Sequence, residues 1–102
     1  MELKAAGQIS LCRFPQTNFA SSKLRPVLLI AELPGNYDDW LVCMISSQTH
    51  QYTPGLDEII NNDSPDFSQS GLKGESVIRT TRTAVVSGNM LVGVLGEISD
   101  HR

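Results

Sequence analysis

The sequence predicts an all-β or nearly all-β fold, in the form of a small, mostly antiparallel barrel or half-open sheet. Short runs of apolar and β-branched residues recur along the chain, as is typical of strands. Segments rich in proline, glycine, asparagine, aspartate and serine separate these runs and indicate turns. No long 3.6-residue periodicity, which would indicate an amphipathic helix, interrupts the pattern.

Two strands are predicted in the first third of the chain. Residues 8–14 alternate between polar and apolar positions and end at Pro15. Residues 26–31 form an apolar run typical of a buried strand, with Pro26 as its first residue because no ladder hydrogen bond is required there. Pro26 also restricts Arg25 to extended backbone. The Arg25 guanidinium therefore stands at the start of a rigid strand, where it either holds an anion or is simply solvated.

The middle of the chain predicts a central strand followed by a loop. After a turn at residues 34–36, the wholly apolar residues 40–45 predict a strand antiparallel to the previous one, ending at Ser46 and Ser47. Residues 48–55 predict a loop.

Signals are more mixed in the next segment. Residues 56–60 fit either a strand or one helical turn, and residues 61–74 are mostly turn-forming. Within the latter, Phe67 and Leu72 are expected to be anchored in the core.

Two more strands are predicted near the end of the chain. Residues 76–86 are dense in β-branched residues and predict a strand that is kinked around Thr80 and Thr81. After a turn at residues 87–89, residues 90–98 favour a strand, with a short helix as the alternative.

Length and composition indicate one small domain, residues 1–102, with a single core. The hydrophobic content of 40% and charged content of 19% are ordinary for a globular protein. The longest apolar run is too short to cross a bilayer, and the N-terminus lacks the layout of a secretory signal, so we expect a cytoplasmic protein without membrane contact. The net charge of −3 argues against a broad basic face for DNA, but leaves room for a small basic groove.

The cysteine and histidine content predicts neither a disulfide nor a metal site. Cys12 and Cys43 both lie in apolar, strand-like segments, which favours buried free thiols in a reducing compartment. With only His50 and His101 besides, no spacing typical of a structural zinc site is present. We therefore expect no metal and no cofactor.

The sequence lacks the local motifs of several enzyme classes. It contains no nucleophile elbow, phosphate-binding loop, dinucleotide fingerprint or metalloprotease motif. His50 is either a general acid or base or an incidental loop residue. The acidic residues in turn-like segments are expected to be solvated or to cap turns: Asp38, Asp39, Asp57, Glu58 and Asp63.

Polar residues at the ends of predicted strands form the candidate site. Arg25 opens one strand, Ser46 and Ser47 close the next, and a polar group interrupts a third: Arg79, Thr80, Thr81 and Arg82. If antiparallel pairing brings these ends together, they form a pocket with cationic and hydroxyl groups and no acid. Such a pocket suits a phosphodiester, because guanidinium pairs with two phosphate oxygens and stabilises the charge of a pentacoordinate transition state. RNA supplies its own nucleophile, the 2′-hydroxyl, so no metal is needed.

An alternative remains for the hydroxyl groups of this candidate site. Ser46, Thr80 and Thr81 could serve only to satisfy backbone groups at strand ends.

Several motifs together resemble a known family. They follow one another in order: Gly-Gln-Ile-Ser-Leu and Phe-Pro within residues 7–15, Ser-Lys-Leu-Arg-Pro-Val-Leu-Leu-Ile at 22–30, Ile-Ser-Ser at 45–47, Ser-Gly-Leu-Lys at 70–73, Ser-Val-Ile-Arg at 76–79 and Leu-Gly-Glu-Ile-Ser at 95–99. In these motifs the sequence resembles the PemK/MazF family of toxins, over most of its length. The resemblance implies a small SH3-like barrel with at most one or two short helices, which forms a homodimer. It also implies a metal-independent, sequence-selective endoribonuclease that cleaves single-stranded mRNA and is neutralised by an antitoxin peptide.

The resemblance also implies roles for individual residues. Arg25 matches the arginine of the family's Arg-Pro motif, which acts in catalysis. Ser46 stands where the family has a catalytic threonine or serine, and Arg79 matches an arginine with a general-acid role in the PemK branch. The remaining residues expected to bind RNA are Lys23, Ser47, His50, Thr81 and Arg82.

The sequence departs from the family pattern in its acids. The PemK branch has an aspartate, the proposed general base, where this chain has Thr81, and residues 18–22 hold no carboxylate before the Arg-Pro motif. These departures leave open His50 as another base, weak activity, or a barrel without catalysis that binds RNA or inhibits a protein such as DNA gyrase. Many members continue into a C-terminal helix, for which Ser99 and Asp100 would form a suitable N-cap.

Overall fold

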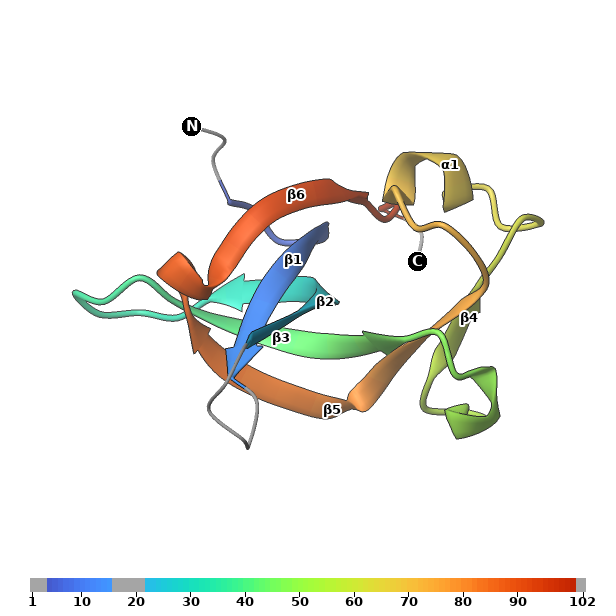
Figure 1. Cartoon of the computed structure of the whole chain (residues 1–102), viewed down its shortest axis with the longest axis horizontal. Helices are drawn as coiled ribbons and strands as arrows, with labels where there is room; N and C mark the ends of the chain where they lie inside the picture. Colours follow the sequence, from blue (N-terminus) through green and yellow to red (C-terminus); the bar gives the residue numbers. More distant parts are fainter. Residues whose placement is uncertain (1–3, 16–21, 101–102) are drawn as a thin grey trace.

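The computed structural model describes residues 4–15 and 22–100, and in this part of the chain six strands form one antiparallel sheet (Figure 1). The strands are β1 (Gln8–Pro15), β2 (Ser22–Glu32), β3 (Asp39–Ser46), β4 (Glu58–Ile60), β5 (Ser76–Ser87) and β6 (Leu91–Glu97). Their order across the sheet is β4-β5-β3-β2-β1-β6. One α-helical turn, α1 (Phe67–Ser70), and two 3₁₀ turns, Thr49–Gln51 and Gly88–Met90, accompany the sheet. The predicted all-β class is confirmed.

The sheet is strongly curved, and β6 arches away from the layer that contains β3 and β5 (Figure 1). β4 and β6 form the two edges of the sheet, and α1 lies against β6. A Cβ atom at Gly96 of β6 would lie 2.0 Å from the carbonyl oxygen of Gln69 in α1. Only glycine permits this approach of the two backbones. The fold is thus the half-open form of the predicted barrel.

The core occupies both faces of β3. Trp40 and Val42 belong to one buried cluster, whereas Cys43 and Ile45 belong to another. Because successive residues of a strand point to opposite faces, β3 is covered on both sides. This explains why residues 40–45 are wholly apolar, as predicted for a central strand.

Phe67 and Leu72 pack against the cluster that contains Cys43, so their expected anchoring in the core is confirmed. The short helix α1 between them was not predicted, because its four residues are too few to show a periodicity. Residues 58–60 form a strand rather than a helical turn, and residues 91–97 likewise form a strand.

The predicted start of the second strand was wrong. β2 begins at Ser22 rather than at Pro26, and residues 22–25 pair with β1 alone. Pairing with β3 begins one residue after Pro26, at Val27 opposite Met44. Pro26 therefore marks the end of the part of β2 that pairs with β1 but not with β3. Arg25 lies in this part of β2 and is exposed.

The predicted kink in β5 is confirmed as a bulge. Thr83 lies opposite Cys43 of β3, but Arg79 lies opposite the next residue, Met44. The intervening residues 80–82 have no partner on β3. Such an insertion bends a strand and redirects its side chains.

Cys12 and Cys43 are buried free thiols, as expected, and they lie in different core clusters. None of the helices in the described segments has the length and apolar character that crossing a membrane would require. Within the same residues, histidine, cysteine and acidic side chains do not gather in groups of three or more that could bind a metal ion. Residues 16–21 and the chain end at 101–102, including His101, lie outside the described residues.

Candidate active site

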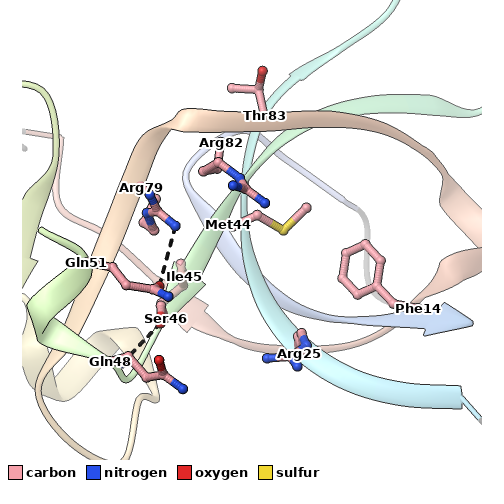
Figure 2. Close-up of a pocket in the computed structure, with 10 residues that line it drawn as sticks. All are labelled: Phe14, Arg25, Met44, Ile45, Ser46, Gln48, Gln51, Arg79, Arg82 and Thr83. Carbon is pink, nitrogen blue, oxygen red and sulfur yellow. Dashed lines mark hydrogen bonds between the residues drawn. The ribbon is translucent and has the colours of Figure 1, made fainter. Parts of the chain in front are cut away.

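A pocket of about 470 Å³ lies where β2, β3 and β5 meet the loop after β3 (Figure 2). Three arginines dominate its charge: Arg25 from β2, and Arg79 and Arg82 from β5. Ser46, at the end of β3, lies between these strands. The other lining residues are Phe14, Met44, Ile45, Gln48, Gln51 and Thr83.

The strand order explains this gathering of polar side chains. β3 lies between β2 and β5, and Met44 pairs with Val27 on one side and with Arg79 on the other. Arg25 lies two residues before Val27, so guanidinium groups flank the end of β3 from both neighbouring strands. Antiparallel pairing thus brings Arg25, Ser46, Arg79 and Arg82 to one pocket, as expected, although the arginines lie within their strands rather than at strand ends.

The pocket carries an excess of positive charge. Arg25 and Arg82 are exposed, and no acidic side chain among residues 4–15 and 22–100 pairs with either of them. Arg79 is more enclosed, with 20% of its side chain exposed, and its Nη1 donates to Gln51 Oε1 over 3.4 Å. Cationic groups around an open pocket form a binding site for anions.

The Ser46 hydroxyl is fixed by the loop that follows it. Its oxygen accepts a hydrogen bond from the backbone N–H of Gln48 at 3.0 Å. A hydroxyl that accepts one hydrogen bond keeps its own proton for donation. Ser46 therefore satisfies a backbone group, as the structural alternative expected, and still offers a donor to a ligand in the pocket.

A second pocket, of about 550 Å³, adjoins the first and shares Arg25, Ile45, Ser46 and Gln48 with it. Its additional residues include two lysines, Lys23 and Lys73, and apolar side chains such as Leu24, Leu72 and Leu95. Ser47 also lines this second pocket. We call the two pockets together the arginine groove.

Not every expected site residue reaches the arginine groove. The first pocket contains Arg25, Ser46, Arg79 and Arg82, and the second adds Lys23 and Ser47. His50 lies exposed in the 3₁₀ turn after β3, and Thr81 lies exposed in the β5 bulge; neither lines either pocket. The hydroxyl of Thr80 donates to the carbonyl oxygen of Leu56 and so satisfies a backbone group.

The expectation that Asp57 is solvated was wrong. Asp57 is buried, and its Oδ2 atom accepts the backbone N–H of Thr53 at 3.1 Å, so only its turn-capping role is confirmed. The same oxygen lies 3.9 Å from Nε of Arg79. The lining of the first pocket holds no acid, as predicted, but Asp57 lies behind one of its arginines and Glu75 lines the second pocket. In the sequence, the available signal for this role was the position of Asp57 directly before the short strand at residues 58–60.

Gln48 and Gln51 are also absent from the set predicted by sequence. Both line the first pocket. The backbone N–H of Gln48 donates to the Ser46 hydroxyl oxygen, and the side-chain oxygen of Gln51 accepts from Arg79. Their positions depend on the 3₁₀ turn, which the composition of a polar loop does not specify.

The buried thiols do not supply a nucleophile. Burial raises the pKa of the Cys43 thiol from 9.0 to about 11, and the negative charges of Asp57 and Glu58 add to this shift. Burial also raises the pKa of Cys12. Both thiols therefore stay protonated near neutral pH, where the thiolate is the nucleophilic form.

Comparison with known protein families finds a match over nearly the whole chain. A family model described as "PemK-like, MazF-like toxin of type II toxin-antitoxin system" matches residues 5–102, nearly the whole chain. A search of curated proteins found no significant match. The chain therefore belongs to the PemK-like, MazF-like family of toxins of type II toxin–antitoxin systems.

Proposed function

We propose that this toxin is a metal-independent endoribonuclease that cleaves single-stranded mRNA and leaves 2′,3′-cyclic phosphate and 5′-hydroxyl ends. The observation that carries the proposal is the convergence of Arg25, Arg79 and Arg82 with the Ser46 hydroxyl around one open pocket. These groups can bind a phosphodiester and stabilise its transition state. Membership of a type II toxin family supports a role in growth arrest.

In the proposed reaction the 2′-oxygen of RNA forms a bond to phosphorus while the bond from phosphorus to the 5′-oxygen breaks. Arg25 and Arg79 bind the non-bridging phosphate oxygens, whose negative charge increases in the transition state. Ser46 donates a hydrogen bond that positions the phosphate or the 2′-hydroxyl. The proton of the 2′-hydroxyl passes to water, one of the two arginines donates a proton to the 5′-oxygen, and that arginine regains its proton from water.

The second pocket of the arginine groove fits the nucleotides next to the cleaved bond. Lys23 and Lys73 can contact neighbouring phosphates, and the leucine side chains offer apolar surface to bases. This combination supports binding of an extended single strand and a preference for certain bases.

Type II toxin family membership implies a protein antitoxin as partner. We propose that a segment of the antitoxin occupies the arginine groove and excludes RNA, and that the active toxin is a homodimer. The positive charge of the groove favours an acidic antitoxin segment.

The direct test is incubation of the purified protein, in EDTA, with a long defined RNA, followed by mapping of the new 5′ ends. We expect discrete cuts that end in 5′-hydroxyls and that disappear in Arg25→Ala. Arg13→Ala is the matched control, because Arg13 is an exposed β1 arginine that lines neither pocket. A folded Arg25→Ala variant that still cleaves RNA would contradict the proposal.

One observation favours a second candidate function: Thr81 stands at the sequence position where the PemK branch has its proposed general base, and its side chain lines neither pocket. A barrel without catalysis would bind RNA or inhibit a protein target such as DNA gyrase. In that case the folded wild-type protein leaves the RNA intact but still arrests growth when produced in cells.

A further inference from the structure

Asp57 and Arg79 form a buried pair whose hydrogen bonds are incomplete. The Asp57 side chain is fully buried, and its Oδ1 atom has no hydrogen-bond partner. Nε of Arg79 is also buried without a partner, although it lies 3.9 Å from Asp57 Oδ2. Burying a carboxylate is costly unless an opposite charge or hydrogen bonds compensate. Such unsatisfied groups call for an explanation.

The pairing of β4 with β5 brings the two side chains together. Glu58 of β4 pairs with Ile78 of β5 in antiparallel register. Asp57 directly precedes Glu58 and Arg79 directly follows Ile78, so Asp57 and Arg79 are cross-strand neighbours, and such neighbours interact. The carboxylate therefore faces the arginine because of strand register, not because of a flexible loop.

Two further contacts fix the carboxylate and the turn that carries it. The backbone N–H of Thr53 holds Asp57 Oδ2. The Thr80 hydroxyl, in the β5 bulge, holds the carbonyl oxygen of Leu56, one residue before Asp57. The turn that carries Asp57 is thus tied to the same bulge that follows Arg79.

We propose that Asp57 is a positioning residue that orients the Arg79 guanidinium toward the scissile phosphate; this inference rests on the proposed RNA cleavage. Asp57 engages the Nε edge of the guanidinium, which leaves the two Nη groups directed at the pocket. Gln51 holds Nη1 only at 3.4 Å, a long hydrogen bond that a phosphate oxygen can replace. The fork of arginine suits this division between a carboxylate behind and a phosphate in front.

Asp57 is not assigned the role of general base. Its side chain is fully buried and lines neither pocket of the arginine groove, so it has no direct path to a 2′-hydroxyl. It acts through Arg79, which lines the pocket.

The test compares Asp57→Asn with Asp63→Asn. The asparagine side chain keeps an oxygen for the Thr53 N–H and nearly the same volume but removes the charge, whereas Asp63 is an exposed turn residue away from the groove. We expect Asp57→Asn to lower kcat for RNA about tenfold or more while KM changes little, because Arg79 acts mainly in the transition state. Asp63→Asn should cleave RNA like the wild type.

A double-mutant cycle distinguishes a purely structural role of Asp57 from an effect that acts through Arg79. If Asp57 acts through Arg79, Asp57→Asn should cause no further loss in an Arg79→Ala background. An equal fold-loss in both backgrounds would overturn the proposal. So would wild-type kcat in a folded Asp57→Asn protein that cleaves RNA.

A second measurement does not depend on catalysis. It tests the Asp57–Arg79 contact even if the variant fails to fold or the protein does not cleave RNA. In ¹⁵N NMR of the wild type, the Arg79 Nε–H should exchange with solvent more slowly than that of Arg25 or Arg82. Equal exchange at all three would overturn the Asp57 contact, whatever the cleavage result. Slow exchange at Arg79 without any RNA cleavage would support the contact and overturn the proposed function instead.

Discussion

Met44 of β3 lies opposite Arg79 of β5, although the residue before it, Cys43, lies opposite Thr83. In a regular strand, residues three apart point to opposite faces of the sheet. Arg79 and Arg82 are three apart, yet both line the same pocket. The bulge between them therefore gives the pocket two of its three guanidinium groups.

Arg79→Lys should lower kcat for RNA about tenfold or more, because lysine keeps the charge but cannot contact a carboxylate and a phosphate through one planar fork. Cleavage of a fluorescent oligoribonucleotide measures the rate, and circular dichroism checks the fold. Wild-type kcat in a folded Arg79→Lys protein would show that only the charge at this position matters.

Much of this fold could be predicted because its strands are marked by composition. The apolar residues 40–45 indicate a strand buried on both faces, and the β-branched residues 76–86 indicate the longest strand of the sheet. The helical turn α1 was not predictable, because it is stabilised by its tertiary position against β6 rather than by a repeating pattern.

The candidate site was predictable in part. Ser46 ends β3, and Arg25 and Arg79 lie in the two strands that pair with β3 on either side, so antiparallel pairing brings the three residues together. Asp57 was missed because an aspartate in a turn is usually solvated, and only the register of β4 with β5 turns it toward Arg79. The start of β2 was predicted at Pro26 rather than at Ser22, because residues 22–25 pair with β1 but not with β3 and are not a buried apolar run.

Lys23→Ala should weaken RNA binding without changing the cleavage site. Lys23 lines the second pocket of the arginine groove, where it can contact a phosphate next to the cleaved bond. Loss of one phosphate contact should reduce the slope of log affinity against log salt by about 0.7 for a single strand. Titration of an uncleavable 2′-O-methyl oligonucleotide at several salt concentrations measures this slope. An unchanged slope would place Lys23 outside the RNA path.

His50→Ala should cleave RNA at a rate within about twofold of the wild type at each pH, since the side chain is exposed and lines neither pocket. The pH profile of kcat/KM measures this. A large loss of activity in a folded His50→Ala protein would instead identify His50 as the missing base.

Gly96→Ala should destabilise the protein by about 1–3 kcal/mol, because the new methyl group would collide with the Gln69 carbonyl oxygen of α1. Gly93→Ala is the matched control in the same strand, since a Cβ there meets no atom within 4 Å. Urea unfolding compares the two variants. Equal stability of both would contradict the close packing of α1 on β6.

Cys43 should make stability fall at alkaline pH. Its pKa is raised from 9.0 in the unfolded chain to about 11 in the fold, so the folded state holds the proton more tightly. The stabilisation is complete below pH 9 and is lost as the pH rises from 9 to about 11. The urea midpoint should decline less over this range in Cys43→Val than in the wild type. A parallel decline in both proteins would show that Cys43 does not titrate as described.

The most direct test of the central claim is mass spectrometry of the products of a short oligoribonucleotide cut in ¹⁸O-labelled water and EDTA. Attack by the 2′-hydroxyl predicts a 2′,3′-cyclic phosphate and a 5′-hydroxyl, with no ¹⁸O in the freshly formed cyclic phosphate. A single 2′-deoxy substitution at the cut site should then abolish cleavage. A 5′-phosphate that carries ¹⁸O, or an RNA left intact by the folded protein, would contradict the account.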